Sequence, residues 1–222
     1  MQAHPAVVDP DVELVEQAKR GDPDAITQLY RRYEQRAYNL ALRMLGNPWD
    51  AADVTQEAFI KAFGAIERFR GEARFGTWLH RIVANAVHDH LRRRRADPLE
   101  DEVMDRLSSG SPMAGAALVG SAHAAVGPAA DGLSEPLRLA LLELEEGFRL
   151  AVVLCDLLGY NYAEAAEILG VQEGTIKSRI FRARATLSAR LRQAGYEPGA
   201  KGNPPLEPVV TADATPPGQQ DE

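Results

Sequence analysis

Apolar residues recur every three or four positions along most of the chain, which is the spacing of one face of an α-helix. The pattern begins at about Asp11 and breaks at residues 21–23, where an Asp22-Pro23 pair can cap and start a new helix. It stops again at residues 46–48, and Asp50 is expected to open the next long helix. Since no stretch alternates apolar and polar residues as a strand would, the sequence predicts an all-α fold.

A third amphipathic helix is predicted to follow the basic loop at residues 69–75, with Thr77 as its cap. Beyond residue 98 the chain becomes rich in Ala, Gly, Ser and Pro, and helical periodicity returns at Ser134. We therefore expect two small helical domains joined by a flexible linker: a flexible N-terminus at 1–10, a first domain at 11–98, the linker at 99–133, a second domain at 134–195 and a disordered tail at 196–222.

Residues 162–187 have the spacing of a helix-turn-helix, in which Ala166 allows close helix approach, Gly170 forms the turn and Ile176 anchors the core. On a helix of about 3.6 residues per turn, the side chains within roughly 40° of Ile176 are Ile180, Ala183 and Leu187. The outward face carries Ser178, Phe181, Arg182 and Ala185, flanked by Lys177, Arg179 and Arg184. Such a face suits a helix in a DNA major groove; the alternative is a solvated basic helix on an ordinary bundle.

The net charge of −7 does not by itself suit a nucleic-acid-binding protein, but the charges are distributed unevenly along the chain. Residues 61–95 carry nine Lys and Arg against three acidic residues, and residues 171–195 carry six against one. Such segregation predicts two separate surfaces for polyanions. The single cysteine, Cys155, excludes an intrachain disulfide and a multi-cysteine metal site. Neither a signal peptide nor a membrane span is indicated, so we expect a cytoplasmic protein.

Three stretches occur in a specific order: DAADVTQEAFIKAF, then FRGEARFGTWLHRIVANAVHDHLRRRR, and after the linker EEGFRLAVVLCDLLGYNYAEAAEILGVQEGTIKSRIFRARATL. In this order and spacing the chain resembles the extracytoplasmic-function (ECF, group 4) RNA polymerase sigma factors of the sigma-70 family over residues 11–98 and 134–194. The resemblance implies a sigma region 2 domain followed by a sigma region 4 domain. It also implies three partners, namely core RNA polymerase through the clamp and flap of its large subunits, promoter DNA, and an anti-sigma factor.

The resemblance gives roles to residues that the sequence alone leaves ambiguous. The residues implied to contact the polymerase clamp, which could otherwise be a solvated acidic stripe near a helix N-terminus, are Asp53, Gln56 and Glu57. The residues implied to take up a flipped base of the −10 element are Phe69, Arg70, Arg74, Asn85 and His88. The loop among them could instead be a connecting turn packed on the core. The residues implied to meet the −35 element are Lys177, Ser178, Phe181, Arg182 and Arg184.

The sequence and the resemblance together predict a sigma factor that directs core RNA polymerase to promoters and is not itself an enzyme. We expect no catalytic residue, no metal site and no cofactor. Two other functions stay open on the sequence alone. The chain could be an autonomous helix-turn-helix transcription regulator, or an enzyme with a histidine-centred site at His80 and His88.

Overall fold

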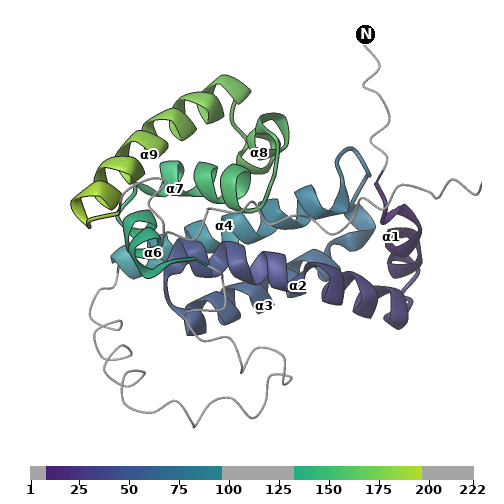
Figure 1. Cartoon of the computed structure of the whole chain (residues 1–222). Helices are drawn as coiled ribbons and strands as arrows, with labels where there is room; N and C mark the ends of the chain where they lie inside the picture. Colours follow the sequence, from purple (N-terminus) through teal and green to yellow (C-terminus); the bar gives the residue numbers. More distant parts are fainter. Residues whose placement is uncertain (1–8, 97–132, 197–222) are drawn as a thin grey trace, which may run out of the picture.

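The computed structural model describes residues 9–96 and 133–196, and every regular element within these two ranges is helical, which confirms the all-α prediction (Figure 1). Residues 1–8, most of the expected linker and most of the expected tail lie outside the described residues. The N-terminal domain contains α1 (Val12–Lys19), α2 (Pro23–Leu45), α3 (Pro48–Gly64), the 3-10 turn η1 (Ile66–Arg68) and α4 (Phe75–Ala96). The C-terminal domain contains α6 (Glu135–Leu142), α7 (Glu146–Val152), the π-helical turn η2 (Val153–Leu157), α8 (Tyr162–Leu169) and α9 (Glu173–Gln193).

α2, α3 and α4 form the body of the N-terminal domain, since each turns an apolar face toward the other two. α2 begins as predicted, with the Asp22 carboxylate accepting a hydrogen bond from the backbone N–H of Asp24 at 2.9 Å. α3 begins two residues earlier than predicted, because Asn47 and not Asp50 is its cap. The Asn47 side chain accepts from the backbone N–H of Trp49 at 2.8 Å, which starts the helix at once after the preceding turn.

The start of α4 is set by a residue far away in the sequence. The predicted cap, Thr77, lies buried inside the helix, which begins at Phe75. The Asp9 carboxylate accepts from the backbone N–H of Phe75 at 2.6 Å, in the position that a local cap would occupy. The neighbouring Asp11 is fully buried and accepts hydrogen bonds from Tyr33 and Arg32 of α2. The segment before α1 therefore ties α2 to the start of α4.

The helix-turn-helix predicted at residues 162–187 is present as α8, a turn and α9. Asn161 and Glu164 form a capping box at the start of α8. Gly170 ends α8 with a φ of 63°, a left-handed conformation that favours glycine. Ala166 is buried, as expected at a close helix approach. The predicted core side of α9 is also confirmed, with all four of its residues buried: Ile176, Ile180, Ala183 and Leu187.

The two domains pack directly against each other (Figure 1). α8 lies along α4, while α6, α7 and η2 contact α2. Buried apolar side chains of both domains form one continuous cluster, in which Leu40 and Met44 of α2 join Leu154 and Leu158 from η2 and the residue after it. The interface therefore has an apolar centre as well as the polar contacts described below.

Candidate nucleic-acid interface

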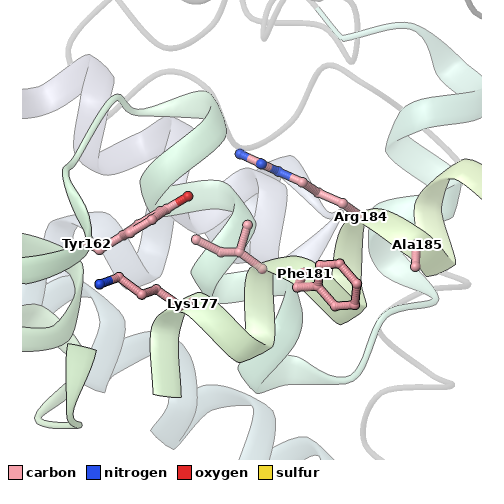
Figure 2. A pocket seen from close by; sticks show the side chains of 6 residues that line it. Tyr162, Lys177, Phe181, Arg184 and Ala185 are labelled. Carbon is pink, nitrogen blue, oxygen red and sulfur yellow. The ribbon is translucent and has the colours of Figure 1, made fainter. Parts of the chain in front are cut away.

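The outward face of α9 is open to solvent, as the sequence predicted. Lys177, Ser178, Phe181 and Arg182 are all exposed, and the Phe181 side chain reaches 77% exposure. A shallow recess continues this face onto the start of α8 and is lined by Tyr162, Lys177, Ile180, Phe181, Arg184 and Ala185 (Figure 2). The surface thus offers an aromatic ring, a small apolar patch and several cations within a few turns of one helix.

Of the four cations on or beside this face, two are held by acidic side chains, and two, Arg179 and Arg182, have no acidic partner among the described residues. Lys177 Nζ lies 2.7 Å from Glu173 Oε1, one helical turn earlier. This hydrogen bond raises the pKa of Lys177. The Arg184 guanidinium donates two hydrogen bonds of 3.0 and 2.6 Å to the Asp156 carboxylate, which raise the pKa of Arg184. In the part of the chain that the structure describes, Arg182 has no acidic partner. Arg179 is only partly exposed, whereas Arg182 is exposed, so the Arg182 guanidinium is the one best placed to meet an added ligand.

A second candidate surface lies on α3. Asp53 and Gln56 are exposed, and Glu57 is partly exposed. The Glu57 carboxylate lies 2.6 Å from Lys61 Nζ and 3.6 Å from the guanidinium of Arg93, and the hydrogen bond from Lys61 lowers the pKa of Glu57. Partial burial raises the pKa of Asp53. The three predicted residues share one side of α3, at the spacing i, i+3 and i+4.

The same side of α3 carries an apolar residue that sequence reasoning missed. Ile60 follows Asp53 by seven residues, two helical turns, and is 66% exposed. Trp49, at the start of the helix, is also exposed. The sequence could have indicated this exposure, because Ile60 lies outside the helical spacing of the apolar residues that α3 buries. The surface is therefore acidic with exposed apolar residues, a combination that favours contact with a protein partner over a purely solvated surface.

The loop between η1 and α4 is built on a buried aromatic cluster. Phe69 is only 7% exposed, and its ring centroid lies 5.9 Å from that of Phe75 and 5.1 Å from that of Trp78. Phe69 therefore closes the core in this conformation, and its contact with a DNA base stays a prediction. Arg70 and Arg74 are exposed on the same loop. The arginines, and not the aromatic ring, form the accessible part of this loop.

The remaining residues predicted for the −10 element, Asn85 and His88, are exposed on α4 and lie one turn apart. The structure brings two of the predicted residues to the domain interface. His88 Nδ1 donates to the Glu146 carboxylate at 2.6 Å, and the Arg74 guanidinium lies 3.7 Å from the Glu164 carboxylate. Both acids belong to the C-terminal domain.

Two parts of the chain match known families: residues 29–96 match Sigma-70 region 2, and residues 134–187 match Sigma-70 region 4. The chain is 34% identical over 179 residues to the ECF RNA polymerase sigma factor SigW of Bacillus subtilis, across 80% of this chain and 95% of SigW. It is 36% identical over 186 residues to the ECF RNA polymerase sigma-E factor of Escherichia coli K12, across 82% of this chain and 94% of that protein. The chain belongs to the ECF sigma factors.

Two solved structures match the fold over most of the chain. A structure of CnrH in complex with the cytosolic domain of CnrY matches with a TM-score of 0.58 and 32% identity, over 83% of this sigma factor and 99% of the matched chain. The sigma factor RpoE of Bartonella quintana, in complex with the anti-sigma factor NepR, matches with a TM-score of 0.57 and 28% identity, over 75% and 96% of the two chains. Because the region 2 match lies in the N-terminal domain and the region 4 match in the C-terminal domain, these are the sigma region 2 and region 4 domains.

Sigma factors are transcription initiation factors that direct RNA polymerase to promoters, and they are not enzymes. Among the described residues, no group of three or more His, Cys, Asp and Glu side chains is arranged to hold a metal ion. None of the helices in the described part of this sigma factor combines the length and the apolarity that a membrane crossing requires.

His80, one of the two histidines of the enzyme alternative, is fully buried. Its Nδ1 lies 2.7 Å from the Gly76 carbonyl oxygen and 2.8 Å from the Tyr160 hydroxyl oxygen of region 4. Since a carbonyl oxygen only accepts, Nδ1 carries the proton of the neutral ring. Burial lowers the pKa of His80 to about 4; the hydrogen bond to Gly76 opposes this shift, and the charge of Arg36 adds to it. His80 is thus a neutral core residue that joins the two domains of this sigma factor.

Proposed function

We propose that this sigma factor reads the −35 element as duplex DNA with α9, captures the −10 element as a single strand with the loop before α4 and with α4 itself, and docks on the polymerase clamp through α3. The observation that carries the proposal is the outward face of α9, where Phe181 and Arg182 are exposed while the apolar side of the same helix is buried. The other two surfaces follow from the position of their residues in region 2.

The dimensions of α9 suit the proposed −35 contact. An α-helix with its side chains is about 10–12 Å wide, and the major groove of B-DNA is about 12 Å wide. Arg182, which has no acidic partner within the described residues, can form a bidentate contact with a guanine edge. The recess beside Phe181 is apolar enough to receive the methyl group of a thymine. Arg184 and Lys177 flank this centre and would meet phosphates.

The proposed −10 contact uses the exposed cations of region 2 for phosphates and a polar side chain for base edges. Arg70 and Arg74 stand on the loop, and the Asn85 amide on α4 can both donate to and accept from a base. A base could stack on the loop only if Phe69 left its present position among Phe75 and Trp78. We therefore assign the phosphate contacts to the arginines and treat Phe69 as support for the loop.

The proposed partners are core RNA polymerase and an anti-sigma factor. The acidic and apolar side of α3, with Glu57 beside the exposed Ile60, fits a basic helical surface of the polymerase clamp. Two similar proteins were solved with a bound partner, which in the case of RpoE is the anti-sigma factor NepR. An anti-sigma factor for this chain would control access to the same surfaces.

Run-off transcription with core polymerase tests the proposal on a pool of genomic promoters. The purified sigma factor should produce promoter-dependent transcripts that core polymerase alone does not make. Arg182→Ala should lower promoter binding by the holoenzyme about 5- to 150-fold without weakening core binding, since one bidentate base contact contributes about 1–3 kcal/mol. Arg190→Ala is the matched control, because Arg190 pairs with Glu143 near the end of the same helix.

Glu57→Ala should instead weaken the binding of core polymerase, with Glu16→Ala as a control at an exposed, paired acid on α1. Absence of any stimulated transcript would refute the sigma activity proposed here. Tight and specific duplex binding without polymerase would favour the autonomous regulator. Equal loss of core binding in Arg182→Ala and Glu57→Ala would show that the separation of roles between α9 and α3 is wrong.

A further inference from the structure

Both ends of the loop at residues 69–74 are held by residues that precede α2. At the end of the loop, Asp9 Oδ2 accepts a hydrogen bond of 2.6 Å from the backbone N–H of Phe75. At its start, Lys19 Nζ of α1 lies 5.7 Å from the centroid of the Phe69 ring, within the range of a cation–π contact. The two exposed arginines of the loop therefore stand between two points that the N-terminal segment holds in place.

The Asp9 carboxylate uses both of its oxygens. While Oδ2 caps α4, Oδ1 accepts from the backbone N–H of Asp11 at 3.0 Å, and the Asp9 side chain is only 9% exposed. Asp11 is fully buried and accepts a hydrogen bond from the Tyr33 hydroxyl of α2. A segment this close to a chain end frays unless such contacts tie it down. Asp9 is thus a buried link between the frame of α2 and the start of α4.

The backbone just after the loop is also closely packed. A Cβ atom added at Gly76 would lie 2.8 Å from Cε1 of Tyr33, so this aromatic ring lies directly on the first turn of α4. The Tyr33 ring centroid is 5.4 Å from that of Phe75. The segment that completes this frame, residues 9–19, lies outside the residues 29–96 that match Sigma-70 region 2. The support of the loop is therefore larger than the matched family segment.

We propose that Asp9 is a positioning residue for capture of the −10 element. By capping α4 it holds Arg70 and Arg74 in the geometry that meets the strand, while Lys19 holds Phe69 at the other end of the loop. A loop that is ordered before binding loses less conformational freedom when a strand arrives, so the complex is tighter. This inference rests on the −10 role proposed above for the loop.

The test compares Asp9→Ala with Asp9→Asn in the full chain. Alanine removes both acceptor oxygens, whereas the asparagine amide keeps an oxygen that can accept from the Phe75 N–H. The matched control is Asp22→Ala. Asp22 caps α2 in the same domain through hydrogen bonds to backbone groups within three residues of itself. The control therefore removes a helix cap of the same kind and leaves the support of the loop in place.

The first measurement is made on the holoenzyme, at a promoter that the parent chain transcribes in the run-off assay. Promoter opening is followed by the permanganate reactivity of unpaired thymines, and core binding is measured by competition with labelled parent chain. Asp9→Ala should reduce promoter opening about three- to tenfold while core binding stays as in the parent. Asp9→Asn should recover most of the opening, and Asp22→Ala should open the promoter like the parent.

The second measurement contains no polymerase and follows the loop itself by hydrogen exchange and mass spectrometry. Peptides that cover residues 69–79 should exchange about threefold faster or more in Asp9→Ala than in the parent, because the Phe75 N–H loses its acceptor. Peptides of α3 should exchange as in the parent. Asp22→Ala should leave the exchange of residues 69–79 unchanged.

The positioning role is refuted if Asp9→Ala opens the promoter as well as the parent does. Equal losses of core binding and of promoter opening would also refute it, since Asp9 would then support the whole domain, including α3. So would an Asp9→Asn variant as defective as Asp9→Ala, because the acceptor oxygen would then not matter.

Failure of the proposed function is seen separately, as a parent chain that opens no promoter. The exchange measurement then decides the role of Asp9 in the loop by itself. Faster exchange at residues 69–79 in Asp9→Ala would support it, and unchanged exchange would refute it.

Discussion

Acidification should destabilise this sigma factor through His80, because burial in the folded chain disfavours the protonated, charged form of the ring. The ring is fully buried and its pKa is lowered to about 4, against an ordinary value of 6.5. Between these two values the unfolded chain binds a proton that the folded chain does not. The stabilising contribution is therefore complete above about pH 6.5 and is lost as the pH falls toward 4.

The two pKa values set the size of the effect. A group with a pKa of 6.5 in the unfolded chain and about 4 in the folded chain lowers the free energy of unfolding by about 2 kcal/mol on going from pH 8 to pH 5. That loss is a large part of the 5–15 kcal/mol that is typical of a folded domain. Both tryptophans, Trp49 and Trp78, lie in region 2, so their fluorescence during urea unfolding reports on the domain that contains His80.

His80→Asn removes the titrating group and keeps an N–H that can reach the Gly76 carbonyl. The variant should be less stable than the parent at pH 8, because the ring leaves a cavity, but it should lose about 2 kcal/mol less between pH 8 and pH 5. His88→Asn serves as the control for loss of an exposed histidine: it removes the contact with Glu146 but should keep the loss of about 2 kcal/mol that His80 causes. If the parent and His80→Asn lose stability in parallel over this range, the burial argument is wrong.

Other substitutions test local features of region 4, each by thermal or urea unfolding. Gly170→Ala should lower the free energy of unfolding by about 1–2 kcal/mol, because Gly170 has a left-handed φ of 63°. Gly174 lies in the helical first turn of α9 with free space around it, so Gly174→Ala should raise the free energy of unfolding by a few tenths to about 1 kcal/mol. Equal effects of the two would contradict the turn geometry. Ile176→Ala should cost about 2–5 kcal/mol, and a loss below about 1 kcal/mol would show that Ile176 is not the core anchor of α9.

Features with a local sequence signature were predicted well. The Asp22-Pro23 start of α2, the turn at Gly170 and the buried and exposed sides of α9 all follow from spacing and from caps within a few residues. The start of α4 was not predictable in this way. Its cap is Asp9, and a carboxylate 66 residues away has no pattern that distinguishes it from a solvated acid.

The candidate site shows the same limit. The exposure of Arg182 and Phe181 follows from helical periodicity, whereas the burial of Phe69 depends on the packing of Phe75 and Trp78 around it. Contacts between the two domains join residues 51 to 122 positions apart, as in the Arg95–Glu146 pair and the Arg36–Leu158 hydrogen bond. Periodicity describes one helix at a time, so it cannot show which helix faces will meet.

The pairing of Arg74 and Arg95 with carboxylates of region 4 has a consequence for counterions. A basic surface usually gains affinity for a nucleic acid because binding releases the counterions of both partners. For a single strand, the logarithm of the binding constant falls by about 0.7 per phosphate contact for each tenfold rise in salt concentration. In the packed chain the carboxylates have already taken the place of those anions. Salt loosens the internal pairs as it screens the strand, so affinity for single strands should fall less steeply with ionic strength than the number of cations implies.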